Sequence, residues 1–230
     1  MFMTPARLET VVEWLRGIHI AAGVVALCSF APPLVVRKGN ALHRRAGWVF
    51  VIAMGVASVL SWAIAPLRML QRPEAQWPSS LFLAYVGLMS FTAAVYGVRI
   101  LGQKARTSTH PLVVDYVPAI ALVLATVLMA AYSCRVGFTL GLLFSGLGLL
   151  TAVPQLKTLS RAPQTRRFWL EGHIGAMLIA CIATLTAFLV NTAGRFTTGS
   201  ATTVMWFVPT VVLVPLMIRW QRKPPPVVDG

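Results

Sequence analysis

Ionisable side chains set in apolar sequence are the feature of this chain that could carry chemistry. Six of them stand within or beside long apolar runs: His19, His43, His110, Asp115, Glu171 and His173. A charged side chain at the centre of a membrane helix costs at least about 2.5–3.5 kcal/mol, and those that are retained there usually serve a function. Imidazoles bind haem iron or zinc and transfer protons near neutral pH, and carboxylates take part in similar chemistry.

His173 is the residue for which a functional role is favoured. It follows Arg167 by six residues, which is about 9 Å along a helix, so we expect it below the headgroups. Ala176 and Ala180 continue its helix face with small side chains. Glu171 stands four residues after Arg167, and a salt bridge near the membrane surface is its simplest interpretation.

Asp115 and His19 each admit two interpretations. Asp115 lies about one turn inside the fourth apolar run, where a carboxylate caps the free N–H groups of a helix N-terminus. Its functional interpretation is a carboxylate that handles protons or orients a ligand. His19 stands near the outer end of the first run, and Ala22 and Gly23 follow it on a small-residue face that a flat ligand or another helix could approach. The alternative for His19 is a rim histidine that bonds water or a carbonyl.

His43 and Arg44 lead into the second apolar run. One interpretation is a basic loop of the kind that stays in the cytoplasm during insertion. The other is a site in which the imidazole and the guanidinium together grip a carboxylate, a phosphate or a haem propionate.

Seven apolar runs must position these side chains. Each approaches the roughly 20 residues that cross a bilayer. The chain is 57% hydrophobic and only 11% charged, against about 25% charged in soluble domains. The predicted fold is therefore an all-α, polytopic transmembrane helical bundle. We place its seven spans near residues 17–36, 46–67, 80–98, 112–133, 136–156, 168–191 and 201–218.

The same runs divide the chain into three parts. Residues 1–16 form a predicted extracytoplasmic tail, whose apolar positions at helical spacing suit an interfacial helix. Residues 17–219 form the seven-helix transmembrane domain. Residues 220–230 form a predicted cytoplasmic tail, in which three consecutive prolines prevent a continuing helix.

Lys and Arg residues are divided unevenly among the gaps between runs. Of the twenty, fourteen fall in every second gap, after the first, third, fifth and seventh runs. Short basic loops stay in the cytoplasm, so the N-terminus is predicted outside and the C-terminus inside. On this topology only His19 lies on the outer side, and the other five candidate residues share the cytoplasmic side.

The net charge of +14 is spread over short loops rather than gathered on one face, which argues against a nucleic-acid partner. The expected partners are the lipid bilayer and the anionic lipids of its inner leaflet. Gly137 and Gly141 form a GxxxG motif. Such small residues suit close helix packing inside the bundle, with a homo-oligomer contact as the alternative.

Four functions fit these residues. The favoured one is a membrane redox protein that binds haem b or a similar cofactor through two of His43, His110 and His173. The second is a small-solute or proton-coupled transporter that uses Asp115, Glu171 and His173. The third is a metal-dependent intramembrane hydrolase, although no paired-histidine motif is present. The fourth is a structural membrane subunit, so whether the protein is an enzyme stays open.

Four segments of the chain carry a resemblance to a known family. They are the His19 helix, residues 37–47 with the motif His43-Arg44-x-x-Gly47, residues 173–191 with the motif His173-x-x-x-Met177, and residues 206–210. Through them the chain resembles an uncharacterised family of bacterial multi-pass membrane proteins, a domain of unknown function. The resemblance implies a protein of the bacterial cytoplasmic membrane and brings no established activity.

Overall fold

The computed structural model describes residues 4–107, 112–193 and 200–222, and these residues are helical almost throughout. The long helices are α1 (Pro5–Val35), α2 (Ala41–Gln71), α3 (Trp77–Arg99), α4 (Val113–Val136), α5 (Thr139–Ser160), α6 (Phe168–Ala193) and α8 (Val208–Arg222). Three short elements accompany them: η1 (Glu74–Gln76), η2 (Ile100–Gln103) and α7 (Ser200–Met205). Seven helical segments are long and apolar enough to cross a membrane. This confirms the predicted all-α bundle of seven spans.

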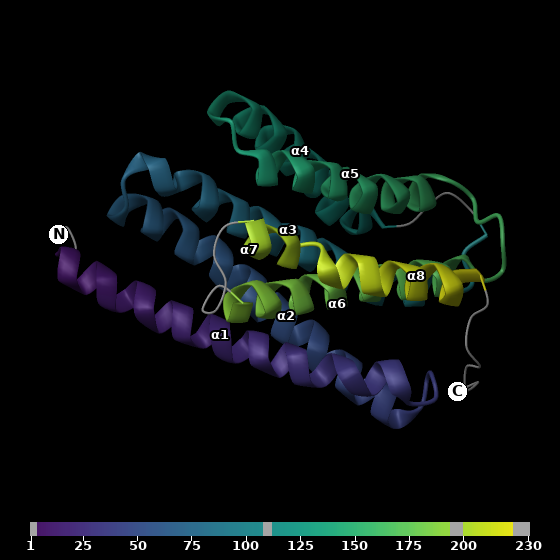
Figure 1. Cartoon of the computed structure of the whole chain (residues 1–230). Helices are drawn as coiled ribbons and strands as arrows, with labels where there is room; N and C mark the ends of the chain where they lie inside the picture. The colour runs from purple at the N-terminus through teal and green to yellow at the C-terminus, as the bar shows by residue number, and fades with distance from the viewer. Residues whose placement is uncertain (1–3, 108–111, 194–199, 223–230) are drawn as a thin grey trace.

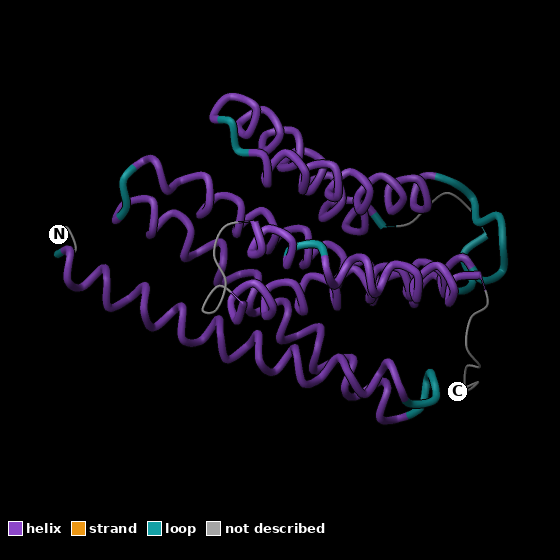
Figure 2. The backbone as a smooth tube through the Cα atoms, viewed as in Figure 1, coloured by secondary structure: helices purple, strands orange, loops and turns teal. Residues whose placement is uncertain are grey.

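The helices run alternately up and down the bundle and are joined by short loops (Figure 2). Helix α3 is central and packs against α2, α4, α5 and α6. Helix α1 lies at one edge, mainly against α2, and the α4–α5 pair lies at the other edge (Figure 1). The start of α1 and the end of α8 lie at opposite ends of the bundle, and the basic gaps gather at the end where α8 finishes (Figure 1). The assignment of that end to the cytoplasm stays a prediction from charge.

Helix α1 begins twelve residues before the first predicted span. It starts at Pro5 and continues without a break to Val35, so most of the predicted tail of residues 1–16 belongs to the same helix as the span. Proline suits the first helical turn, because its fixed φ matches the helix and its missing N–H would have no partner there. Polar residues alone therefore do not end this helix.

The seventh predicted span is two helices, with a break at Trp206 and Phe207. Pro209 explains the break, because it lacks an N–H and its ring collides with the carbonyl four residues earlier. The residues at the break pack inward: the Trp206 ring lies 5.1 Å from that of Phe82 and 5.5 Å from that of Phe144, centroid to centroid.

Glycines set the closest helix contacts. A Cβ added at Gly97 of α3 would lie 2.6 Å from Met177 Cε and 3.2 Å from Ala176 Cβ, so α3 and α6 meet here closely. In the predicted GxxxG motif, Gly141 faces Ser133 of α4, with an added Cβ 2.3 Å from its Oγ. Gly137 ends α4 in the left-handed region at φ 69°. The motif thus serves the α4–α5 turn and packing within the bundle.

Candidate functional site

His43 is the third residue of α2, and α2 begins at the same end of the bundle at which α8 finishes (Figure 1). The turn before it uses Gly39 at φ 83°. Asn40 then caps the helix, because its side-chain oxygen accepts a hydrogen bond of 2.7 Å from the His43 backbone N–H. Asparagine is among the residues best suited to this position. The capped turn therefore fixes the first turn of α2, and with it the base of the His43 side chain.

His173 lies one and a half turns into α6 and faces α3. Its Nδ1 is 2.7 Å from the carbonyl oxygen of Gly97. A carbonyl only accepts hydrogen bonds, so Nδ1 carries the hydrogen and Nε2 of the neutral ring is left with a lone pair. The glycine matters here because a side chain at position 97 would occupy the space that α6 fills.

The rings of His43, at the start of α2, and His173, in α6, lie close together. Their centroids are 6.4 Å apart and their planes are inclined by 59°. His43 Nδ1 is buried and has no hydrogen-bond partner among the residues that the structure describes. Two of the three histidines predicted to share the cytoplasmic side are thus neighbours. The third, His110, lies outside the described residues.

Two lysines flank this histidine pair, each against a tryptophan. Lys38 Nζ donates to the carbonyl oxygens of Pro33 and Leu34, at 2.8 and 2.7 Å, and lies 4.6 Å from the centroid of the Trp220 ring. Burial lowers the pKa of Lys38 from its ordinary value of 10.5. Its charge is close enough to act on His43. Cation–π contact and the C-terminal carbonyls of α1 together hold this ammonium in place.

Lys104 directly follows η2. Its Nζ lies 4.6 Å from the centroid of the Trp169 ring, and its charge acts on His173. Arg44, the other basic candidate, is exposed at the start of α2 and makes no side-chain hydrogen bond or ion pair within the described part of the chain. The charge nearest the histidines therefore comes from lysines.

Asp115 lies apart from the histidines. It forms an ion pair with Arg99 of α3, accepts a hydrogen bond of 3.2 Å from Gln103 Nε2, and accepts another of 3.1 Å from the backbone N–H of Leu112. The last bond is the helix cap that the sequence predicts. Arg99 is two residues after Gly97, and two residues turn a helix by about 200°. Asp115 and His173 therefore contact opposite faces of α3.

Glu171 does not form the expected salt bridge with Arg167. Within residues 4–107, 112–193 and 200–222 the single ion pair is Arg99–Asp115. The backbone of Glu171 instead holds α8, because its carbonyl oxygen accepts a hydrogen bond of 3.1 Å from Gln221 Nε2. With Asp115 on the far face of α3, the three residues predicted for a transporter do not form one cluster.

His19 lies near the middle of α1 rather than at its outer end, because α1 begins at Pro5. Its Nδ1 is 2.9 Å from the carbonyl oxygen of Ala57 in α2. Ala57 follows His43 by fourteen residues, which is about 21 Å along α2. His19 is therefore separate from the histidine pair and joins α1 to α2, as in the alternative in which it bonds a carbonyl.

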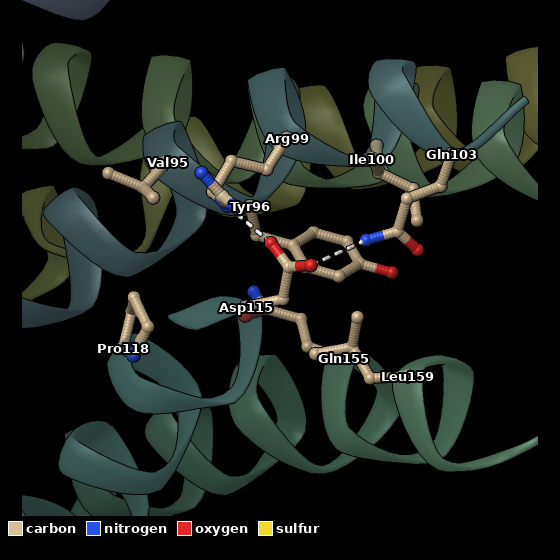
Figure 3. Close-up of a pocket in the computed structure, with 9 residues that line it drawn as sticks. All are labelled: Val95, Tyr96, Arg99, Ile100, Gln103, Asp115, Pro118, Gln155 and Leu159. Carbon is tan, nitrogen blue, oxygen red and sulfur yellow. Dashed lines mark hydrogen bonds and ion pairs between the residues drawn. The ribbon is translucent and has the colours of Figure 1, made fainter. Parts of the chain in front are cut away.

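A second polar group gathers between α3, α4 and α5 (Figure 3). Asp115 is its only member among the residues predicted from the sequence. Its other polar members are Tyr96, Arg99, Gln103 and Gln155. Arg99 is one of the basic residues that follow the third apolar run, and there it predicts only the orientation of the bundle. An uncharged amide such as Gln155 barely alters the hydropathy of a span. A glutamine inside an apolar run is the signal that could have found this group.

A hydrolytic metal site needs more donors than these groups offer. Among the described residues, no group of three or more His, Cys, Asp or Glu side chains is placed to hold a metal ion. A hydrolytic zinc site uses three protein ligands and leaves one position for water. The described residues thus leave the predicted intramembrane hydrolase without a ligand set.

Comparison with known proteins identifies no matching family model, no matching curated protein and no matching solved structure.

Proposed function

We propose that the protein is a membrane redox protein that holds haem b, or a similar planar metal cofactor, between His43 and His173. The separation of the two rings carries this proposal. A metal–imidazole bond is about 2 Å long, so two rings that bind one metal from opposite sides have centroids roughly 6 Å apart. The observed separation is 6.4 Å.

The hydrogen bond to Gly97 supports His173 as a ligand. Metal-bound histidines usually donate their other ring N–H to a carbonyl or carboxylate, which fixes the tautomer and the orientation of the ring. His173 already makes such a bond through Nδ1, which leaves Nε2 for the metal. The other ring, His43, has a buried Nδ1 that no described residue satisfies.

The surroundings of the pair also suit a flat anionic cofactor. Gly47 follows His43 by one helical turn, and a Cβ added there would meet no atom within 4 Å. No side chain therefore packs against position 47 of α2. The ammonium groups of Lys38, whose charge acts on His43, and of Lys104, whose charge acts on His173, suit the two propionates of haem. When bound, the cofactor would supply one-electron transfer, and the protein residues would hold and orient it.

The proposed setting is the cytoplasmic membrane of a bacterium, with the histidine pair on the cytoplasmic side. Charge supports this orientation, because the basic gaps share the end of the bundle that holds His43 and the end of α8. Anionic lipids of the inner leaflet are the proposed partners of those basic loops.

The deciding experiment is an absorption spectrum of the protein purified after expression with haem supplied, reduced minus oxidised. We expect a Soret and an α band in the wild type. His43→Ala and His173→Ala should each lose most of the bound haem. His19→Ala is the matched control, because it also removes an imidazole bonded to a backbone carbonyl, and it should retain the haem. A wild type without these bands, or single variants that keep them, would contradict the proposal.

A further inference from the structure

The polar pocket between α3, α4 and α5 is not used by the proposed redox site. It is lined by Tyr96, Arg99 and Gln103 from α3 and η2, by Asp115 from α4, and by Gln155 and Leu159 from α5. Figure 3 shows Asp115 in the middle, with its carboxylate linked to Arg99 and Gln103 across the pocket. The pocket lies near the end of the bundle where α8 finishes.

Two amide oxygens in this pocket have no donor. The side chain of Gln155 is buried, with 5% of its surface exposed, and its Oε1 has no hydrogen-bond partner in the described structure. Gln103 Oε1 is likewise buried and unpaired there, although its Nε2 binds Asp115. Buried carbonyl groups without a donor are unfavourable, and folded proteins usually satisfy them with protein groups or ordered water.

The size of the pocket limits what can satisfy these oxygens. About 10 Å³ is open to the centre of a water-sized sphere, which is close to the minimum that holds one water molecule. The site is also polar, as a buried water requires, since a typical one makes about three hydrogen bonds. A metabolite or a lipid headgroup is too large for this space.

The charges in the pocket select among small occupants. The Asp115 carboxylate is already paired with the Arg99 guanidinium, and this cation would repel a second cation beside the same carboxylate. An anion would face that carboxylate and two unpaired amide oxygens. A neutral molecule that donates hydrogen bonds is repelled neither by the Arg99 guanidinium nor by the Asp115 carboxylate.

We propose that this pocket is a binding site for one water molecule, which donates a hydrogen bond to Gln155 Oε1. The water hydrates the Arg99–Asp115 ion pair and ties α5 to it, so that three helices share one polar contact. Neither the histidine pair nor the haem proposed for it takes part. Failure of this proposal therefore leaves the proposed function unaffected, and the reverse also holds.

The test is an experimental structure of the full chain, in lipid or detergent, at a resolution that shows ordered water. We expect a density peak in the wild type at about 2.7–3.0 Å from Gln155 Oε1, and no such peak in Gln155→Leu, which keeps a similar side-chain volume. Thr151→Val is the control one turn earlier on α5, because the Thr151 hydroxyl is satisfied by the Leu147 carbonyl oxygen, and it should keep the peak. A dry pocket in the wild type, or a protein donor on Gln155 Oε1, would overturn the proposal. The wild-type map alone decides it if the leucine variant does not fold.

A second measurement separates water from a metal cation. Thermal unfolding of the wild type should give the same Tm in sodium, potassium and choline chloride, because a water site does not depend on the cation. A saturable rise in Tm with one cation that Gln155→Leu abolishes would show a cation site instead and would overturn the proposal.

Discussion

His173 of α6 binds the backbone of Gly97 in α3, with 2.7 Å between Nδ1 and the carbonyl oxygen. The absence of a side chain at Gly97 permits the approach, since a Cβ there would lie 3.2 Å from Ala176 Cβ and 2.6 Å from Met177 Cε. The orientation of the imidazole therefore depends on close packing of two helices as well as on its own residue.

Gly97→Val is expected to push α6 away from α3. Overpacking of this kind typically costs about 1–3 kcal/mol, so we expect a lower Tm in detergent and weaker haem binding. Gly55→Ala is the control, because Gly55 also lies within a helix and a Cβ there meets no atom within 4 Å. Equal Tm values for wild type and Gly97→Val would mean that α3 and α6 do not pack this closely.

Arg99 and Asp115 should show strong coupling in a double-mutant cycle. Asp115 is 7% exposed and Arg99 is 36% exposed, so Arg99→Ala leaves a buried carboxylate without its cation. Breaking a buried pair from one side lowers the free energy of unfolding by about 3–5 kcal/mol. Because Arg99 is partly exposed, we expect a loss toward the lower end of this range. Adding Asp115→Ala should restore part of the stability that Arg99→Ala removes. Simple additivity of the two Tm changes would contradict the ion pair.

Gly148 of α5 leaves room for the hydroxyl of Tyr85, which bonds Thr126 Oγ1 at 3.0 Å and the Phe144 carbonyl oxygen at 3.1 Å. A Cβ at Gly148 would lie 1.9 Å from that hydroxyl. Gly148→Ala should therefore lower stability by about 1–3 kcal/mol. Tyr85→Phe removes the nearer of two colliding oxygens, and Thr126 Oγ1 would still lie 2.6 Å from the added Cβ. The double variant should therefore recover part of the loss.

The control for this pair is Gly146→Ala, where an added Cβ meets no atom within 4 Å. It should leave the free energy of unfolding within about 0.5 kcal/mol of the wild-type value. Failure of Tyr85→Phe to relieve Gly148→Ala would show that the hydroxyl is not the group that occupies this space.

Lys38 should make the folded protein more stable as pH rises toward 10.5. Burial lowers its pKa below 10.5 in the folded protein, whereas the unfolded chain keeps the ordinary value. Between the two values the unfolded state binds more protons, so folding becomes more favourable as pH rises. The Tm of the wild type, measured relative to that of Lys38→Met, should therefore increase as pH rises from neutral toward 10.5.

The matched control is Lys157→Met, because Lys157 is exposed near the end of α5. It should show the same pH dependence as the wild type over this range. If the difference between Lys38→Met and the wild type does not change with pH, the buried position of the Lys38 ammonium is wrong.

The direction of the bundle in the membrane can be read with fused reporters. The basic gaps predict a cytoplasmic C-terminus, so a fluorescent protein fused there should fold and fluoresce. Alkaline phosphatase, which needs export for activity, should be active in the gap between α2 and α3 and inactive at the C-terminus. Phosphatase activity at the C-terminus would reverse the assignment of the two ends.

The number of membrane spans and their helical type follow from hydropathy alone, because crossing a bilayer forces long apolar helices. The capping role of Asp115 was also accessible, since it depends only on the nearby start of α4. The observed helices differ from the predicted spans in two places, and both differences have local causes in the sequence. The residues before position 17 continue α1 in spite of their charges, and Pro209 divides the last span.

The meeting of side chains from distant helices could not be derived in the same way. Hydropathy shows that His43 and His173 belong near one end of the bundle, but their contact depends on which helices are neighbours and on their rotation. Those features are set by close contacts such as Gly97 against Ala176. Gln155 was missed for a different reason: an uncharged amide changes the hydropathy of its span very little.

Helix α1 is longer than a membrane span requires. Its 31 residues extend about 46 Å at 1.5 Å per residue, whereas the hydrocarbon layer is about 30 Å thick. Even with tilt, its first turns project beyond the lipid tails. Arg7, Glu9 and Glu13 are exposed on those turns. They therefore belong to a continuous helix, and any molecule that approaches this end of the bundle encounters them at fixed helical spacing.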